Sequence, residues 1–454
     1  DIIITSHNLV DKVKDLNVPL IEIDSVSIKE DILNNKIQSE VISLDTIPEN
    51  DAALVLFTSG TTGRPKGALH THTSIDHMIK SLVEAWKYNE NDRILHFLPL
   101  HHLHGVMNKL LCVLWSGGLV EFTSPSPVSL WKRLETNIPP VDRPVSLFMA
   151  VPTVYSLLLQ TTSSICPGRL ERALQNIRSL RLMVSGSAAL PGPVSTAWTD
   201  LTGHILLERF GMTEIGMALS NPYEGERRIC EVGVPLPFIQ CRLVDDDEKE
   251  IIDDFTPTAR DDNQERSDRV KITASGEIRV KGPTLFKEYL NLPDVTSNAF
   301  DTEGWFRTGD TAVRTSLGTY KILGRTSVDI IKCGGYKLSA LEIERELLSH
   351  PQISEAVVVG QPHETLGEVP LAVIIPHPVQ SISSTNNTSS SSSQSYVETE
   401  TVPLDLSSIK EFLEDSLASY KHPRALLIVQ HIPKNALGKV NKKTLLQNLT
   451  TLDA

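Results

Sequence analysis

Cysteine is scarce in this chain, and its few copies are scattered. The sequence holds 5 cysteines among 454 residues. No two of them form the C-x-x-C pair that marks zinc sites and redox-active thiols. An odd number of widely spaced cysteines indicates a reducing compartment rather than a disulfide framework. The sequence therefore offers no cysteine-based metal or disulfide-exchange centre.

Long apolar runs and an excess of basic charge are also missing. No apolar run approaches the roughly 18 residues that a membrane-spanning helix needs. The chain carries 43 basic and 56 acidic residues, a net charge of −13, so it has no basic field to attract nucleic acid or an anionic membrane. We therefore expect a small-molecule ligand, no nucleic-acid partner and no integral membrane segment. A hydrophobic content of 40% is ordinary for a globular protein with a core.

The first three quarters of the sequence predict an α/β fold. Short apolar runs such as "RILHFLPL", "PVSLFMAVPT" and "LRLMVSGSAAL" alternate with longer helical patterns. Runs that are apolar throughout are typical of strands buried on both faces of a mainly parallel sheet. "GEIRVKG" alternates as a half-buried strand would. We therefore predict helices layered over a mainly parallel sheet.

The pattern changes near residue 326, which predicts a second, smaller domain. A helix is expected from about Ser339 to His350, followed by two strands in "EAVVVGQP" and "PLAVIIP" and by a later helix with Asp405 at its N-cap. We predict a large N-terminal domain over residues 1–326 and a small mobile α+β domain over residues 327–454. The Ser-rich stretch 379–402 cannot bury a core, so it is interpreted as a disordered loop.

One loop has the composition of a phosphate-binding site. It follows the strand-like run "AALVLF", and parallel α/β sheets bind ligands at the ends of such strands. Its glycines allow backbone amides to approach an anion, and its hydroxyls and single lysine add donors and charge. The alternative is a flexible turn. The residues concerned are Thr58, Ser59, Gly60, Thr61, Thr62, Gly63 and Lys66.

The full string and four later motifs resemble the adenylate-forming superfamily, which includes acyl-CoA synthetases. The motifs are "FTSGTTGRPKG", "RFGMTE" (209–214), "GWFRTGD" (304–310), "GRTSVDIIKCGGYKLSALEIE" (324–344) and "NALGKV" (435–440). The resemblance implies ATP, Mg²⁺ and coenzyme A as cofactors. It also implies two half-reactions, in which a carboxylate first forms an acyl-adenylate and a thiol then displaces AMP. A hinge near Ser327 would let the small domain swing between them.

The same resemblance implies roles for single residues. Lys439 would bridge the attacking carboxylate and the phosphate, and Glu214, beside Thr213, would bind Mg²⁺. Asp310 would accept the ribose hydroxyls with help from Arg325. The other implied contacts are adenine with Gly186, Ser187 and Phe210, and the pantetheine arm with Gly334 and Gly335.

Three residues are expected to bind the acid, in segments that look most like the malonyl-CoA synthetase branch, namely His102, His104 and Arg209. His102 matches a histidine common to the superfamily, so His104 and Arg209 are the two that indicate which acid is bound. A guanidinium at the end of an acyl pocket would be an uncompensated buried charge, which costs on the order of 3–5 kcal/mol. A second carboxylate on the substrate would compensate that charge through a bidentate pair. The alternatives are that Arg209 faces a structural glutamate or solvent and that His104 only packs.

These observations predict an ATP-dependent, AMP-forming ligase for malonate, or for methylmalonate. The alternatives are a ligase for another short- or medium-chain acid and a non-catalytic nucleotide-binding remnant. The remnant is considered because only 57 residues precede Thr58, fewer than in the family it resembles, so much of a first subdomain is expected to be missing. Relatives of this branch indicate the mitochondrial matrix or the cytoplasm, and any targeting segment would lie outside this chain.

Overall fold

The computed structural model describes residues 3–6, 20–23, 48–58, 65–136, 143–251, 274–377, 404–433, 440–442 and 444–446. The chain divides into two compact units, residues 1–49 and 50–454. In the first unit, β1 (Ile3–Ser6) pairs in parallel with β2 (Leu20–Ile23). All further elements belong to the second unit.

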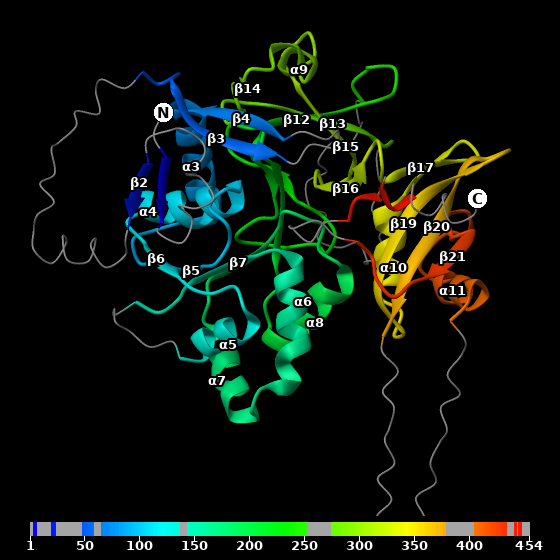
Figure 1. Ribbon diagram of the computed structural model, residues 1–454, viewed down its shortest axis with the longest axis horizontal. Coiled ribbons are helices and arrows are strands. Elements are labelled where there is room, and N and C mark those ends of the chain that lie inside the picture. The colour runs from blue at the N-terminus through cyan, green and yellow to red at the C-terminus, as the bar shows by residue number, and fades with distance from the viewer. Residues whose placement is uncertain are drawn as a thin grey trace, which may run out of the picture. The chain divides into compact units, whose positions relative to one another are not determined.

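A seven-stranded sheet forms the centre of the second unit (Figure 1). Its strand order is β11-β10-β9-β8-β7-β5-β6, and the pairs among β5 to β9 are parallel, whereas β10 and β11 run antiparallel. The bounds are β5 (Arg93–His96), β6 (Leu119–Phe122), β7 (Leu147–Ala150), β8 (Leu182–Ser185), β9 (Leu207–Met212), β10 (Gly216–Ser220) and β11 (Val234–Pro235). The three apolar runs contain β5, β7 and β8, each buried at all four positions, which confirms the predicted mainly parallel sheet.

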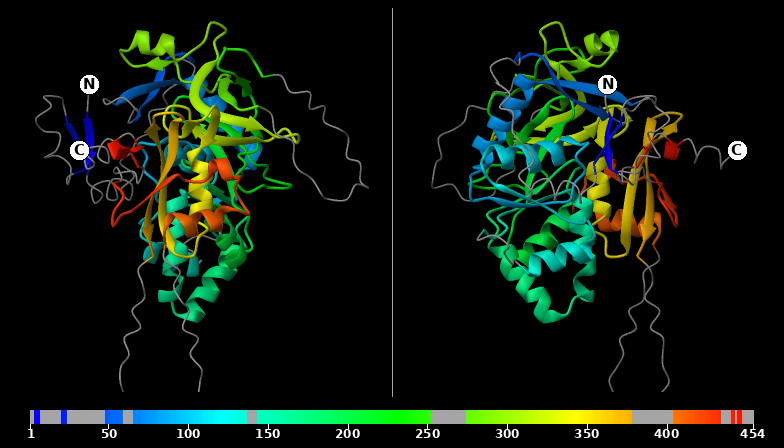
Figure 2. Two further views of the ribbon diagram at one scale, coloured as in Figure 1. Left: turned by 90° about the vertical axis from the view of Figure 1, so that its right-hand side faces the viewer. Right: turned by 60° about the vertical axis from the view of Figure 1, so that its left-hand side comes forward.

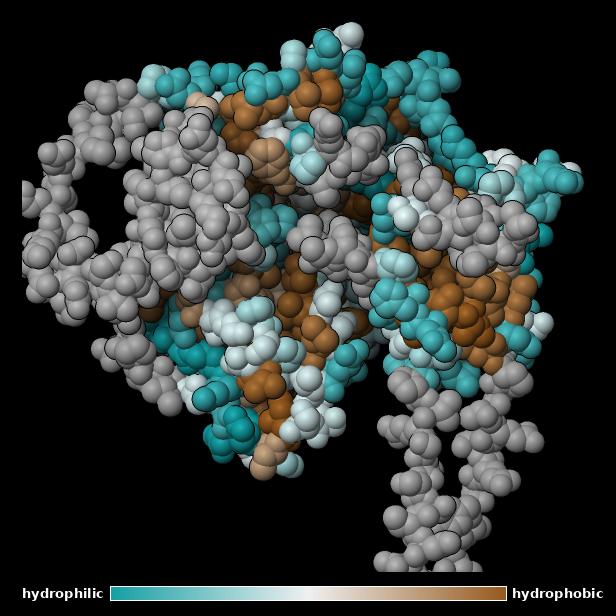
Figure 3. Space-filling model, viewed as in Figure 1, coloured by the Kyte–Doolittle hydropathy of each residue, from teal (hydrophilic) through white to brown (hydrophobic). Residues whose placement is uncertain are grey.

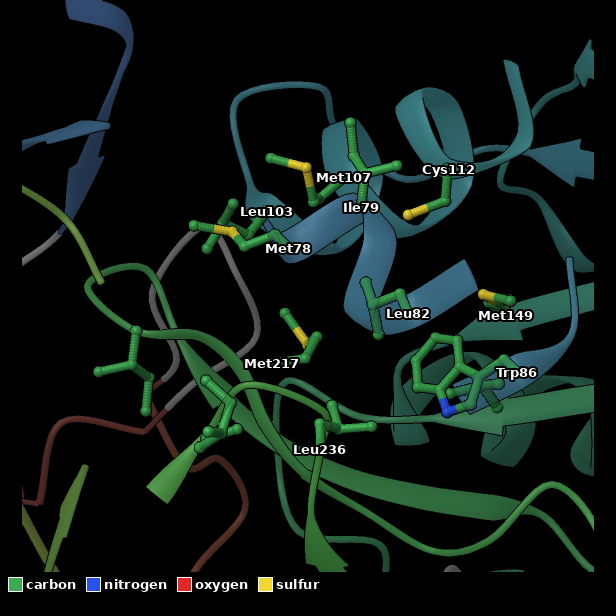
Figure 4. Close-up of a cluster of buried hydrophobic side chains, with 14 of the residues drawn as sticks. Met78, Ile79, Leu82, Trp86, Leu103, Met107, Cys112, Met149, Met217 and Leu236 are labelled. Carbon is green, nitrogen blue, oxygen red and sulfur yellow. The ribbon is translucent and has the colours of Figure 1, made fainter. Parts of the chain in front are cut away.

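Alternate residues of these strands face two different cores, because successive side chains point to opposite faces of a sheet. Leu147 and Met149 join one core, whereas Phe148 and Ala150 join the other. The first core is completed by α3 (His72–Trp86), the π-helix η4 (His104–Leu111) and α4 (Cys112–Trp115), and Figure 4 shows its sulfur-rich centre. The second is covered by four helices that Figure 1 shows grouped together, α5 (Pro127–Glu135), α6 (Pro152–Thr161), α7 (Pro167–Arg178) and α8 (Gly192–Thr202). A short 3₁₀ turn, η5 (Thr162–Ser164), extends α6.

Two smaller antiparallel sheets carry the remaining motifs of the larger predicted domain. The sheet β14-β4-β3 consists of β3 (Ala52–Thr58), β4 (Lys66–Thr71) and β14 (Glu288–Tyr289), with α9 (Pro293–Asn298) following. The sheet β12-β13-β15-β16 consists of β12 (Gln240–Val244), β13 (Gly276–Lys281), β15 (Phe306–Arg314) and β16 (Tyr320–Arg325). The predicted alternation of β13 is broken at Arg279. That side chain is 2% exposed because it pairs with Glu248, Glu277 and Asp301.

The C-terminal part of the chain forms a further sheet, β18-β17-β20-β19, with β21 paired to β20. Its elements are β17 (Ile330–Cys333), β18 (Tyr336–Ser339), α10 (Ala340–Leu347), β19 (Ile353–His363), β20 (Gly367–Pro376), α11 (Leu406–Leu413), η6 (Ser419–Lys421) and β21 (Ala425–Ile428). Both predicted helices are present but shorter than expected, and Asp405 accepts two backbone N–H bonds at the start of α11.

The C-terminal sheet is covered on one face by α10 and α11, as the two views of Figure 2 show. Apolar side chains reach the surface over this sheet (Figure 3). Ile428, at the end of β21, is one of the exposed large apolar residues of this part of the chain. In the described part of the chain, none of the helices is both long and apolar enough to cross a membrane. The Ser-rich stretch 379–402 lies outside the described residues, and the predicted domain boundary at 326/327 stays a prediction.

Candidate active site

The predicted phosphate loop starts and ends in a hairpin. Strands β3 and β4 pair so that Thr58 lies opposite Lys66. Ser59, Gly60, Thr61, Thr62 and Gly63 lie outside the described residues. The Lys66 ammonium lies 5.1 Å from the ring centre of Tyr289, a cation–π arrangement that holds the charge without neutralising it. The hairpin therefore places one available cation at the predicted phosphate site.

Tyr289 joins this cation to the predicted metal ligand. Its hydroxyl donates to Glu214 Oε1 at 2.9 Å, and Glu214 is 7% exposed in the turn between β9 and β10. The preceding residue, Thr213, accepts a hydrogen bond from His70 Nε2 on β4 through its carbonyl oxygen, at 2.8 Å. Burial, and secondly the Glu214 charge, raise the pKa of Tyr289, so the phenol stays protonated as a donor. Three elements distant in sequence thus meet at Glu214.

Asp310 and Arg325 are neighbours across two strands. They are register partners in β15 and β16, and Arg325 Nε lies 3.0 Å from Asp310 Oδ1. Arg325 also donates to the Thr308 carbonyl at 2.8 Å, which fixes the guanidinium beside the carboxylate. Burial raises the pKa of Asp310 to about 6, although Arg325 opposes the shift, and the charge of Glu214 contributes to the rise. The predicted ribose and metal carboxylates therefore lie within electrostatic reach of each other.

Arg209 is a buried cation without a carboxylate. It is 4% exposed on β9, and none of the described residues pairs a carboxylate with its guanidinium. The adjacent Glu208 is bonded instead to the Leu190 N–H. Burial lowers the pKa of Arg209 to about 10, so the side chain remains charged at neutral pH. Neither alternative, solvent or a structural glutamate, accounts for this guanidinium within the described chain.

Two other predicted residues share a hydrogen-bond network with Arg209. Its Nη2 donates to Ser187 Oγ at 3.4 Å, and Ser187 Oγ lies 3.2 Å from His104 Nδ1. Burial, and then the charge of Arg209, lower the pKa of His104 well below its ordinary value, so the ring is neutral. When Ser187 accepts from Arg209 and donates to Nδ1, the His104 proton resides on Nε2.

The network therefore ends in two donors without acceptors. Arg209 Nε and His104 Nε2 are both buried, and neither has a hydrogen-bond partner among the residues that the structure describes. Buried donors are normally satisfied, and an unsatisfied one costs about 1–3 kcal/mol, with more for a charged group. Ser187 itself has φ of +72°, a left-handed conformation that is rare for non-glycine residues outside functional sites. The arrangement suits an anionic ligand.

Gly186 has a packing role that the sequence did not reveal. A Cβ atom at this position would lie 2.5 Å from Arg209 Nε and 2.6 Å from its Cζ. Only a glycine lets the guanidinium lie against the backbone between β8 and Ser187. Gly186 was predicted as an adenine contact, and it also packs against Arg209, which was predicted to bind the acid.

Gly334 and Gly335 have a local explanation in the structure. They form the turn of the β17–β18 hairpin, with φ of +55° and +85°. A two-residue turn with both φ values positive requires such residues. The predicted contact with the pantetheine arm is therefore not needed to explain the glycines, and it stays a prediction.

Three predicted site residues remain, namely His102, Phe210 and Lys439. His102 lies in the turn before η4, with its ring 4.3 Å from that of His101. Phe210 is half-buried on β9 and packs against two core clusters. Lys439 lies outside the described residues. Sequence reasoning missed Tyr289, which belongs to no motif, and the fully buried Lys109, which donates to the Met149 carbonyl beside the Phe97 ring.

The sequence matches two known protein-family models. Residues 2–290 match the AMP-binding enzyme family, and residues 342–439 match the AMP-binding enzyme C-terminal domain. The chain belongs to the AMP-binding enzyme family. The resemblance noted from five motifs is thus confirmed, as is the α/β fold class.

Three similar proteins illustrate the relationship. A malonate–CoA ligase of Arabidopsis thaliana is 41% identical over 93% of this chain, which spans 65% of that protein's length. A mitochondrial malonate–CoA ligase, ACSF3, of Xenopus laevis is 43% identical over 90% of this chain and 67% of its own length. The crystal structure of ATP-bound MatB from Rhodopseudomonas palustris matches with a TM-score of 0.76 and 28% identity, covering 99% of this chain and 79% of MatB.

The packing of Gly186 predicts the effect of one methyl group. In Gly186→Ala the new Cβ must displace the Arg209 guanidinium, so use of the acid should fall by about tenfold or more in kcat/KM, since small misplacements are costly. ATP binding, measured by calorimetry, should change less than use of the acid, because the atoms that the new Cβ meets belong to Arg209. Gly192→Ala is the matched control, because a Cβ there meets nothing within 4 Å. Equal effects of the two substitutions would contradict the packing role.

The raised pKa of Asp310 predicts a gain of stability when its charge is removed. The folded chain binds this proton more tightly than the unfolded chain does, so stability is lost as pH rises from about 4 through 6. Asp310→Asn should raise the free energy of unfolding near neutral pH by up to about 3 kcal/mol and change it little near pH 4. Urea unfolding at both pH values measures this, with the exposed Asp294→Asn as control. A pH-independent effect would contradict the assignment.

Proposed function

We propose that the chain forms the catalytic part of an ATP- and Mg²⁺-dependent, AMP-forming ligase that joins malonate to coenzyme A. The observation that carries the proposal is the buried Arg209 guanidinium, which has no carboxylate partner in the described chain. Its Nε and the neighbouring His104 Nε2 are the two unsatisfied donors. The similarity to two malonate–CoA ligases supports the acid and coenzyme A, and the similarity to ATP-bound MatB supports the nucleotide.

The distal carboxylate of malonate would occupy the site of the two unsatisfied donors. It would accept from Arg209 Nε and from His104 Nε2, which satisfies both groups at once. A neutral His104 fits this role, since its single proton is directed at the ligand and it adds no second positive charge. An acid without a second carboxylate would leave the guanidinium buried and unpaired, so the site discriminates against monocarboxylates.

The nucleotide would lie along the residues that surround Glu214. Lys66, which lies over the Tyr289 ring, would contact the phosphates. The Asp310 carboxylate would accept hydrogen bonds from the ribose hydroxyls while Arg325 holds it in place. Glu214 fits Mg²⁺, because a single carboxylate together with phosphate oxygens and water is the usual ligand set of this ion. When bound, Mg²⁺ would neutralise phosphate charge. The described residues contain no cluster of three or more side chains that would hold a metal by protein ligands alone.

The proposed reaction has two balanced steps. A carboxylate oxygen of malonate attacks the α-phosphorus of ATP, and the bond from that phosphorus to the bridging oxygen breaks, which releases pyrophosphate. The coenzyme A thiol then attacks the acyl carbon of the adenylate. The bond between this carbon and the phosphate oxygen of AMP breaks, so AMP leaves, and the thiol proton passes to solvent. Lys439, by resemblance, would act in the first step. Alignment and charge neutralisation supply most of the catalysis in such transfers.

The proposed cellular compartment rests on the similarity to known malonate–CoA ligases and not on a signal in this sequence. A mitochondrial relative supports the mitochondrial matrix, and the cytoplasm remains the alternative prediction. Methylmalonate remains the second acid to test, because its distal carboxylate would meet the same two donors.

A panel of acids tests the function. Pyrophosphate release from ATP should be fastest with malonate or methylmalonate, and acetate and a long-chain acid should be slower by at least about a hundredfold in kcat/KM. Each acid is assayed with and without coenzyme A. Acetate outrunning malonate would show a ligase for another short acid, and no turnover with any acid would favour a nucleotide-binding remnant.

One substitution separates recognition of the acid from recognition of ATP. Arg209→Leu should weaken transition-state binding of malonate by about 3–5 kcal/mol, because the distal carboxylate loses its charge partner. ATP binding should change little. Arg242→Leu removes a guanidinium that already has carboxylate partners, Asp301 and Glu303, and serves as the control for losing an arginine. If the Arg209→Leu variant still turns over malonate, Arg209 has a structural role and does not recognise the acid.

A further inference from the structure

Lys442 is held between two carboxylates. Its Nζ lies 2.5 Å from Asp329 Oδ1 and 2.7 Å from Glu344 Oε1, and the three side chains are only 11–13% exposed. Each carboxylate has a backbone partner as well. Asp329 Oδ2 accepts the Arg325 N–H at 2.9 Å, and Glu344 Oε1 accepts the Val358 N–H at 2.8 Å. Both carboxylates are fixed by the backbone, so the ammonium has one well-defined position.

One end of this ion triad reaches the nucleotide-binding residues. Asp329 follows the predicted hinge at Ser327 by two positions and folds back onto Arg325, which itself pairs with Asp310 at 3.0 Å. Gly324, with φ of +127°, permits this fold, because a Cβ there would lie 2.5 Å from the Asp329 Cβ. Ion pairs and hydrogen bonds therefore connect Asp310 through Arg325 and Asp329 to Lys442.

The other end reaches the C-terminal segment. Lys442 follows Lys439 by three positions, and Val440 packs against the core cluster that includes Val357, Val373 and Leu445. Both contacts, at Val440 and Lys442, lie within three residues of Lys439 in the sequence. The ion triad thus ties the hinge to a point one short stretch of chain from Lys439.

We propose that Lys442 is a positioning residue that holds the segment bearing Lys439 in register with the hinge and with the Asp310–Arg325 pair. The inference rests on the proposed function, in which Lys439 acts in formation of the acyl-adenylate. In the proposed function Lys439 has no part in the thioester-forming step, so loss of the anchor should spare that step. The anchor therefore acts on one half-reaction and not on the other, which a purely structural ion triad would not do.

Lys442→Met tests the proposal. Pyrophosphate release with an accepted acid should fall by at least about tenfold, whereas thioester formation from the chemically prepared acyl-adenylate and coenzyme A should stay within about threefold. Lys442→Arg keeps both ion pairs and should restore the first rate. Lys421→Met is the matched control, because Lys421 pairs with Glu342 on the same helix, α10, but does not contact the C-terminal segment. Equal losses in both half-reactions, or no loss in either, would overturn the proposal.

A milder variant covers the case in which Lys442→Met does not fold. Asp329→Asn keeps the ion pair of Lys442 with Glu344 and should slow pyrophosphate release in the same direction by a few fold. Amide hydrogen exchange over residues 440–446 gives a readout that needs no activity, and it should become faster in both variants. Unchanged exchange overturns the anchoring.

The outcomes of this inference and of the proposed function can be told apart. If malonate fails and another acid is accepted, the half-reaction test uses that acid and decides on Lys442 independently. A wild type that turns over no acid overturns both the proposed function and the catalytic part of this inference. The exchange measurement then still decides whether Lys442 anchors the segment.

Discussion

An unpaired guanidinium buried in a protein interior is the constraint on which the rest of the candidate site depends. Removing such a charge from water is costly, and here no carboxylate of the described chain offsets the cost. Three local features keep Arg209 in place. Gly186 leaves room for the guanidinium, Ser187 adopts a left-handed backbone conformation to bond it, and His104 orients that hydroxyl. The left-handed Ser187 and the buried charge of Arg209 both cost stability in the empty fold.

The sheet explains how adjacent residues of one strand can serve opposite purposes. Glu208 and Arg209 are neighbours on β9, so their side chains leave opposite faces of the sheet and cannot pair with each other. Burial raises the pKa of Glu208 to about 7, which lets that carboxyl shed its charge. Arg209 cannot lose its charge in this way, because its pKa of about 10 still leaves the guanidinium ionised at neutral pH. Within the part of the chain that the structure describes, no carboxylate neutralises the charge of Arg209, which leaves that role to a ligand.

Most of the fold could be predicted from local patterns, and much of the site could not. Short, mostly apolar runs marked β5, β7 and β8, because strands covered on both faces have no polar side that alternates along the strand. Asp405 marked the start of α11 through its capping chemistry. Tyr289 gave no such signal: its contacts with Lys66 and Glu214 join positions more than seventy residues apart in sequence. The role of Gly186 depends on the side chain of a strand that follows later. Contacts of this kind exist only after the sheets have assembled.

Asp310 and Arg209 are both charged groups that are buried at a cost in stability, one negative and the other positive. Burial raises the pKa of the carboxyl and lowers that of the guanidinium, so each shift opposes the charged form that a ligand would need. In the empty site both charges destabilise the folded chain, and each would be relieved by a group on a different part of the bound reactants. Binding of nucleotide and of diacid should therefore each stabilise the fold, since a ligand that binds only the folded state shifts unfolding by mass action. A site built for structure alone would have replaced both residues with apolar ones.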